Sequence, residues 1–96
     1  MYRDDPLDDE AELRAIAGDE PVDTLLAAPV DGERTPLEVA LDVLRVLQGW
    51  VDDRSAARWF STPQRRLADR TPIEALASGA FEEVEDAARA WAAAQG

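Results

Sequence analysis

Two threonine-proline steps, nine residues apart, constrain the fold of this chain more than any other feature. They are Thr62-Pro63 and Thr71-Pro72, within residues 55–79. Because proline disfavours helical backbone in the residue before it and has no amide hydrogen, each step either interrupts a helix or begins one. The apolar residues of this stretch are too sparse for one long helix, and its residues favour helices over strands. The stretch therefore predicts short helices that turn sharply on one another.

Threonine and glutamate together mark two helix starts. Thr35 and Thr71 are each followed by proline, and Glu38 and Glu74 stand three residues beyond them. At this spacing the threonine hydroxyl accepts from the glutamate backbone amide, and the glutamate side chain accepts from the threonine amide. We therefore predict a capping box, and a helix, at both threonines.

The helix that follows Thr35 is expected to be central to the core. Its apolar residues recur with the helical period of 3.6, and charged residues occupy the opposite side. The expected inner face consists of Leu37, Leu41, Leu44, Leu47 and Val51, widened by Val39, Val43 and Val46.

A short helix is expected next, capped by Asp52 or Asp53. It should end at Phe60, and the large apolar side chains of Trp59 and Phe60 should lie in the core. The step at Thr62 is then expected to start another single helical turn.

Two further helices complete the prediction. The helix that starts at Thr71 should end at Gly79, because glycine readily adopts the backbone conformation that closes a helix. Leu67 should point inward before it, and a last helix is expected over residues 80–94. Its expected inner face consists of Phe81, Val84, Ala88 and Trp91.

The first 33 residues differ from the rest in their acidity. A helix over about 7–17, ended by Gly18, and another turn or two over 21–28 are expected, although a loosely held arm fits the composition equally well. We therefore divide the chain into an acidic N-terminal arm, 1–33, partly helical or flexible, and a helical domain, 34–96.

The fold class predicted from these signals is all-α, a small bundle of about five or six short helices. No alternation with period two suggests a strand, and 96 residues are enough for one domain. The sequence has no apolar run long enough to cross a membrane, no secretory apolar segment at its start and no cysteine. These features predict a cytoplasmic protein without a membrane partner.

The net charge of −11 is unevenly distributed along the chain. Residues 1–33 carry −9, residues 34–70 carry +2 and residues 71–96 carry −4. Such acidity argues against nucleic acid as a partner, because binding to phosphates needs a basic surface. Every basic residue is Arg and none is Lys, which suits a protein interface but also follows from a GC-rich genome.

Catalytic and metal-binding chemistry is not expected. The chain has no His, Cys or Lys, so the commonest general bases, thiolate nucleophiles and most zinc sites are absent. The acidic run that includes Asp4 and Asp5 lacks the spacing of a calcium loop, and we interpret it as solvated charge. We therefore predict no enzyme activity, no catalytic residue, no cofactor and no metal site.

A cluster of arginines in the middle of the chain is the best candidate for a binding site. Its members fall within seventeen residues and stand beside Trp59. They form either a solvated face with ion pairs to the acidic arm or an interface in which Arg and aromatic side chains anchor a partner. The cluster consists of Arg54, Arg58, Arg65, Arg66 and Arg70.

Residues 36–95, taken in order, resemble the toxin-binding domain of bacterial antitoxins of the Xre/MbcA/ParS type. The resemblance lies in the order and spacing of an apolar helix, the segment 57–63, Leu67, the segment 70–76, Ser78-Gly79 and a last helix.

The resemblance implies a small helical bundle that binds and neutralises a toxin. The partner in that family is typically a RES-domain toxin that acts on NAD or transfers ADP-ribose. By position, the C-terminal end would lie nearest the toxin's substrate pocket, which adds Gln95 and Gly96 to the expected partner-binding residues.

One feature departs from the family pattern. Many such antitoxins carry an N-terminal helix-turn-helix that binds operator DNA, but residues 1–33 are too short and too acidic for one. We expect this chain to lack that autoregulation or to share it with another protein.

Two other functions remain open from the sequence. One is an acidic adaptor or scaffold whose arm binds a basic partner. The other is a small DNA-binding regulator in which 55–60 and 62–68 form a compact helix-turn-helix. A homo-oligomer is also compatible with the sequence.

Overall fold

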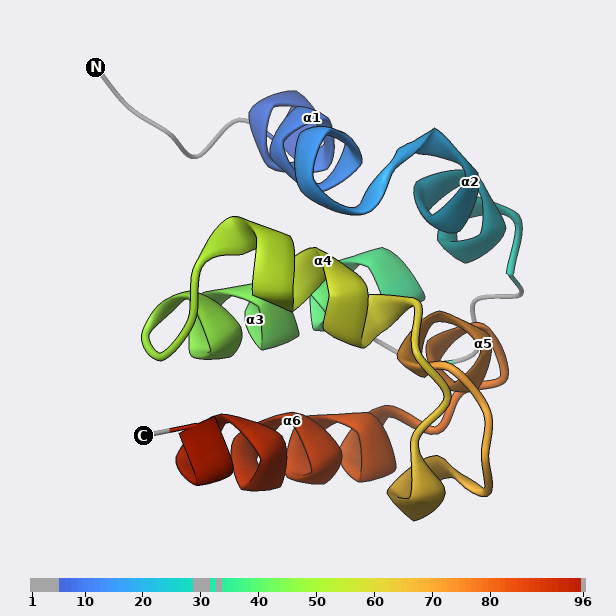
Figure 1. Cartoon of the computed structure of the whole chain (residues 1–96). Coiled ribbons are helices and arrows are strands. Elements are labelled where there is room, and N and C mark those ends of the chain that lie inside the picture. The colour runs from blue at the N-terminus through green and yellow to red at the C-terminus, as the bar shows by residue number, and fades with distance from the viewer. Residues whose placement is uncertain (1–5, 29–31, 33, 96) are drawn as a thin grey trace.

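Six α-helices and one short 3₁₀ turn make up the computed structural model, which describes residues 6–28, 32 and 34–95 (Figure 1). Their bounds are α1 (Pro6–Ala17), α2 (Asp19–Ala27), α3 (Pro36–Gln48), α4 (Asp53–Phe60), η1 (Arg65–Leu67), α5 (Pro72–Ala77) and α6 (Phe81–Gln95). No strand occurs in these ranges, where Gln64 and Arg70 form a single isolated β-bridge. The predicted all-α fold is confirmed.

The helix starts follow from the caps. Thr35 Oγ1 accepts from the Glu38 amide at 3.1 Å, and Glu38 Oε1 accepts from the Thr35 amide at 2.8 Å. Thr71 and Glu74 repeat both bonds at 3.1 and 2.8 Å, so both predicted capping boxes are confirmed.

The helix α4 is capped by the first of the two candidate aspartates. Asp52 Oδ1 accepts from the Ser55 amide at 2.8 Å. This backbone hydrogen bond lowers the pKa of Asp52, because it favours the charged carboxylate.

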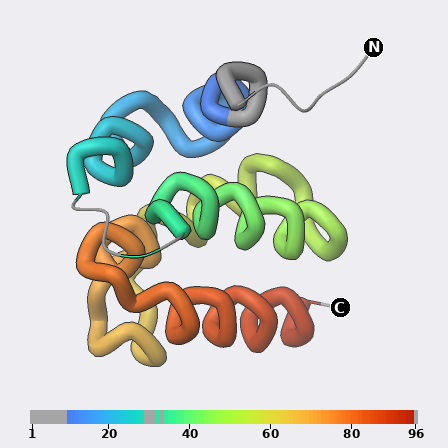
Figure 2. The backbone as a smooth tube through the Cα atoms, turned by 180° about the vertical axis from the view of Figure 1, so that it is seen from behind, coloured from blue at the N-terminus to red at the C-terminus, as the bar shows by residue number. Residues whose placement is uncertain are grey.

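The helix α3 lies in the middle of the bundle and makes its most extensive contact with α6. Figure 2 shows α3 between the α1–α2 layer on one side and α6 on the other. Because helices pack against α3 on several sides, a wider face of α3 is buried than the sequence predicts. This face is centred near Val39 and Val43 and not on the predicted line of leucines. Leu37 and Leu41 are only partly buried, against the expectation that they form the inner face. The buried apolar residues of α3 are Val39, Ala40, Val43, Leu44 and Leu47.

The helix α6 packs through small side chains. Val84, Ala87, Ala88 and Ala92 are buried. Alanines let two helix backbones approach closely, and the larger side chains then stand at the edges of the contact. Phe81 and Trp91 were expected on the inner face, and both are only partly buried.

The two N-terminal helices belong to the same core as the rest. Leu13, Val22 and Leu25 are at most 1% exposed, and α1 and α2 pack against α3, α4 and α5 (Figure 1). Gly18, with a φ of 101°, separates the two helices as predicted. The division of the chain at residue 33 stays a prediction.

The step at Thr62-Pro63 does not start a helix, which corrects the prediction. The Thr62 hydroxyl donates to the Arg58 carbonyl at 2.7 Å and so closes α4. At position 65 an arginine stands in place of the glutamate or glutamine of a capping box, and the Thr62 hydroxyl is already bonded to the preceding helix. Only the three-residue η1 follows, with Leu67 buried as predicted. The DNA-binding alternative is therefore wrong in its structural premise, because residues 62–68 do not form a recognition helix.

Candidate functional site

A groove runs along one side of α6, and the residues of α4 and of the segment around η1 form its opposite wall. Figure 1 shows α4 above α6, with the segment after α4 descending toward the first turns of α6. One part of the groove, of about 250 Å³, lies between Ser55, Arg58 and Thr62 on one side and Trp91 and Gln95 on the other.

The second part of the groove, of about 330 Å³, lies between Arg65 and Arg66 on one side and α6 on the other. The α6 residues that line it are Ala87, Ala90, Trp91 and Ala94. Gln64 and Trp91 line both parts, so the two parts are adjacent. We call this surface the Trp91 groove.

The inner wall of the groove is aromatic. Trp59 is 2% exposed, and its ring centroid lies 5.6 Å from that of Phe60 and 6.2 Å from that of Trp91. The predicted burial of Trp59 and Phe60 is confirmed. The indole Nε1–H of Trp59 is buried and has no hydrogen-bond acceptor among the described residues. Buried donors of this kind are uncommon, because leaving one unpaired costs free energy.

Three of the predicted arginines line the groove. Arg58, Arg65 and Arg66 are exposed, and none of them forms an ion pair or a side-chain hydrogen bond with any residue that the structure describes. Their guanidinium groups therefore keep their donors available to another molecule.

The other two arginines of the cluster lie elsewhere. Arg70 is part of the frame, because its Nε donates to the Leu67 carbonyl at 3.0 Å and its Nη1 to Ser78 Oγ at 2.9 Å. Arg54 is exposed at the start of α4 and does not line the groove. Together with Arg58 it makes a small contribution to the lowered pKa of Asp52.

Of the two predicted C-terminal residues, only Gln95 lies within the described part of the chain. Gln95 lines the groove, and its amide donates to the Trp91 carbonyl at 3.4 Å. Gly96 lies outside the described residues, as do Asp4 and Asp5 of the acidic run.

Outside the cluster, arginines serve the structure through ion pairs with acidic residues. Arg14 reaches Asp23 at 2.9 Å, Glu10 at 3.1 Å and Asp19 at 3.4 Å, and so ties α1 to α2. The bond to Asp23 contributes most to raising the pKa of Arg14 above its ordinary value.

A second ion pair ties α1 to α3. Arg45 forms a two-pronged contact with Glu12, in which each of its terminal nitrogens lies 3.0 Å from a carboxylate oxygen. The acidic arm therefore pairs with arginines in α1 and α3, and the arginines of the groove are left over.

The charge around the groove is the reverse of the charge of the whole chain. Among the described residues, no Asp or Glu lines either part of the groove, although the chain holds 21 acidic residues. Three cations on a surface that no carboxylate lines make a local positive potential.

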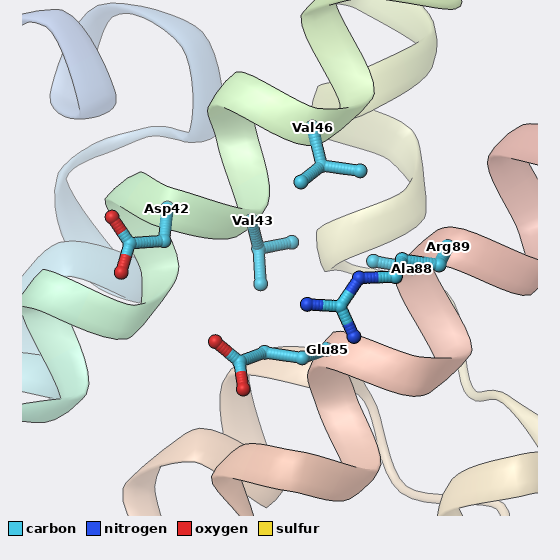
Figure 3. A pocket seen from close by; sticks show the side chains of 6 residues that line it. All are labelled: Asp42, Val43, Val46, Glu85, Ala88 and Arg89. Atoms are coloured by element: carbon cyan, nitrogen blue, oxygen red, sulfur yellow. The ribbon is translucent and has the colours of Figure 1, made fainter.

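A further pocket, between α3 and α6, has its charges matched internally. Figure 3 shows Asp42, Glu85 and Arg89 gathered around Val43 and Val46. Arg34 Nη2 lies 2.9 Å from Asp42 and 2.8 Å from Glu85, and the bond to Glu85 contributes most to raising the pKa of Arg34. We interpret this pocket as a structural junction.

Within the described part of the chain, no group of three or more His, Cys, Asp or Glu residues is placed to hold a metal ion. In the same residues, no helix combines the length and the apolarity that crossing a membrane requires.

Trp91 was expected on the inner face of the last helix and, from the family resemblance, at the start of the C-terminal segment nearest the toxin. Its signal lies in helical spacing, because Ala87, Ala94 and Gln95 stand four before, three after and four after it and so share its face of α6. Trp91 is partly buried and also lines the groove, so this face of α6 is not entirely a core face.

Part of the chain matches a known protein family. Residues 45–91 match the family described as the antitoxin Xre/MbcA/ParS C-terminal toxin-binding domain. This segment contains Arg58, Arg65, Arg66 and Trp91, whereas Gln95 lies beyond it. The sequence matched no curated protein and no solved structure.

Proposed function

Because residues 45–91 belong to the Xre/MbcA/ParS family of antitoxin toxin-binding domains, we propose that this protein is a non-catalytic module that neutralises a cognate toxin by direct contact. A protein that acts only by binding needs a surface that is complementary to its target and already formed. We propose that the Trp91 groove is this surface.

The observation that carries the proposal is the availability of the groove arginines. Arg58, Arg65 and Arg66 flank a partly buried tryptophan and have no ion partner in the described chain. Arg and Trp are the residues most enriched among those that dominate the free energy of protein–protein association. The frame that holds them is fixed by the buried Trp59 and Leu67.

The toxin that we propose is of the RES type, a cytoplasmic enzyme that consumes NAD or transfers ADP-ribose. The support is the family resemblance, in which such toxins are the usual partners. Gln95 lines one end of the groove, and we propose that this end of α6 lies nearest the toxin's substrate pocket.

An acidic adaptor is the less favoured function. Glu10, Glu12, Asp19 and Asp23 of the acidic segment pair with the protein's own Arg14 and Arg45. Those ion pairs use part of the negative charge that a basic partner would need.

Co-expression tests the proposal. The proposed RES-type toxin would be induced in a bacterial host, alone and with the protein carrying an affinity tag. We expect arrested growth with the toxin alone, restored growth with both, and recovery of the toxin with the tagged protein.

The Arg89→Ala variant is a matched control, because Arg89 pairs with Asp86 on α6 and does not line the groove. It should restore growth as the unaltered protein does. Growth arrest that persists although both proteins accumulate in soluble form would refute the proposal.

A further inference from the structure

We propose that the Trp91 groove binds an acidic segment of its protein partner, whose carboxylates pair with Arg58 in one part of the groove and with Arg65 and Arg66 in the other. The inference deepens the proposed function by naming the chemistry of the bound segment. It does not require that the partner be a RES-type toxin.

The polar groups of the groove are mainly donors. Arg58, Arg65 and Arg66 offer guanidinium N–H groups, which can bind a carboxylate through two parallel hydrogen bonds. The amides of Gln64 and Gln95 already donate to the carbonyls of Thr62 and Trp91, at 2.9 and 3.4 Å. An occupant that supplies acceptors therefore fits this surface better than one that supplies donors.

The buried indole of Trp59 points to the same chemistry. It lines the same part of the groove as Arg58, and its Nε1–H has no acceptor among the described residues. An occupant whose acceptor reached this N–H would remove the free-energy cost of leaving the buried donor unpaired.

The α6 side of the groove indicates a segment that lies along the helix. Trp91 stands between the positions of Gln95 and Ala87, so contact continues from one part of the groove to the other. Ala87, Ala90 and Ala94 leave room beside η1 for the side chains of such a segment.

Charge complementarity selects an acidic peptide over a nucleic acid. The chain carries −11, so a nucleic-acid backbone that extends beyond the groove meets a surface whose charge has the same sign as its phosphates. A few carboxylates within the groove feel mainly the nearby arginines, because charges beyond about 10 Å are screened at ordinary ionic strength.

Titration of the full-length, ¹⁵N-labelled protein followed by NMR tests this inference. The probe is hexaglutamate, acetylated and amidated at its ends, and the matched control peptide is hexaglutamine. Trp50, which is 55% exposed in the turn between α3 and α4, is an internal reference for the indole signals of Trp59 and Trp91.

We expect hexaglutamate to shift the indole signals of Trp59 and Trp91 with saturation, to leave that of Trp50 in place and to bind more weakly as salt is added. The Arg65→Ala/Arg66→Ala variant should bind at least about tenfold more weakly, since removal of two charge-assisted contacts costs at least the equivalent of one decade in affinity. The Arg89→Ala variant should bind as the unaltered protein does. Circular dichroism of each variant establishes that its fold is intact.

Several outcomes would overturn the inference. They are an absence of shifts at millimolar hexaglutamate, an equal response to hexaglutamine, and stronger binding of a hexathymidine oligonucleotide. A shift of the groove signals with protein concentration alone would identify a second copy of the chain as the occupant, also against the inference. Since the titration contains no toxin, failure here leaves the proposed function standing, and failure of growth rescue leaves the peptide result unaffected.

Discussion

The two threonine-proline steps share a dipeptide but differ in the residue three positions after the threonine. At Thr71 that residue is glutamate, both capping bonds form, and α5 begins. At Thr62 the corresponding residue is Arg65, the hydroxyl turns back to the Arg58 carbonyl, and the chain continues only into a 3₁₀ turn. The two steps therefore differ both in the residue three positions after the threonine and in the hydrogen bond that the threonine hydroxyl forms.

The difference has a functional consequence. The chain after Thr62 stays irregular, with Ala68 and Asp69 in left-handed backbone conformations and an isolated bridge between Gln64 and Arg70. This segment places Arg65 and Arg66 beside α6 at the wall of the Trp91 groove. The second step stabilises the fold, and the first step shapes the binding surface.

The largest expected effect concerns the packing that holds the first step in place. Since that step has no capping box, its position depends on burial of Trp59 and Leu67. Trp59→Ala should lower the free energy of unfolding by about 3–5 kcal/mol, because it leaves a large cavity in the core. Urea denaturation measures this value, and Trp91→Ala, at a partly buried site, should cost clearly less. Equal costs for the two substitutions would contradict the assignment of Trp59 to the core.

The next effect concerns binding of the partner by the arginines that follow the first step. Arg65→Ala/Arg66→Ala should weaken binding of the partner toxin by about 10- to 30-fold, or about 1.4–2 kcal/mol, and leave the free energy of unfolding within about 0.5 kcal/mol. Alanine is the better choice here, since glutamate or glutamine at position 65 would complete a capping box with Thr62. Calorimetric titration gives the affinity, and unchanged affinity would separate this segment from the interface.

A smaller effect is expected at the second step. Thr71→Ala removes the capping hydroxyl of α5 and should lower the free energy of unfolding by about 0.5–2 kcal/mol. Thr71→Ser keeps the hydroxyl and should recover most of that loss. Urea denaturation of both variants checks the expectation, and an equal loss in both would show that the hydroxyl is not the stabilising group.

The smallest effect is expected at Thr62. Its hydroxyl bonds to a carbonyl at the exposed end of α4, so Thr62→Ala should change the free energy of unfolding by no more than about 0.5 kcal/mol. The same denaturation experiment measures it beside Thr71→Ala. A cost as large as that of Thr71→Ala would remove the distinction between the two steps.

Much of the fold could be predicted because its signals are local. Capping depends on residues within one helical turn, so Thr35, Thr71 and Asp52 revealed where three helices begin. The step at Thr62 was predicted wrongly because the proline was given more weight than the missing glutamate at position 65. The capping-box pattern is complete at Thr71, where Glu74 follows, and incomplete at Thr62, where Arg65 follows.

The site was harder to predict because it depends on which arginine side chains form hydrogen bonds or ion pairs in the folded chain. The sequence offers five neighbouring arginines, and only the packing of α1, α2 and α5 decides which arginines acquire a partner. Arg70 bonds to Leu67 and Ser78, and Arg45 to Glu12 from α1, whereas three arginines are left on the groove. The position of Trp91 at the edge of the α3–α6 contact likewise depends on the close approach that the small side chains of α6 allow.

The most direct test of the central claim uses the proposed RES-type toxin and measures the rate at which it consumes NAD as this protein is titrated into the assay. We predict complete inhibition at one molecule of protein per toxin, with Arg65→Ala/Arg66→Ala requiring a markedly higher concentration. Full toxin activity at saturating protein, or equal inhibition by the variant, would contradict a neutralising module that acts through the Trp91 groove.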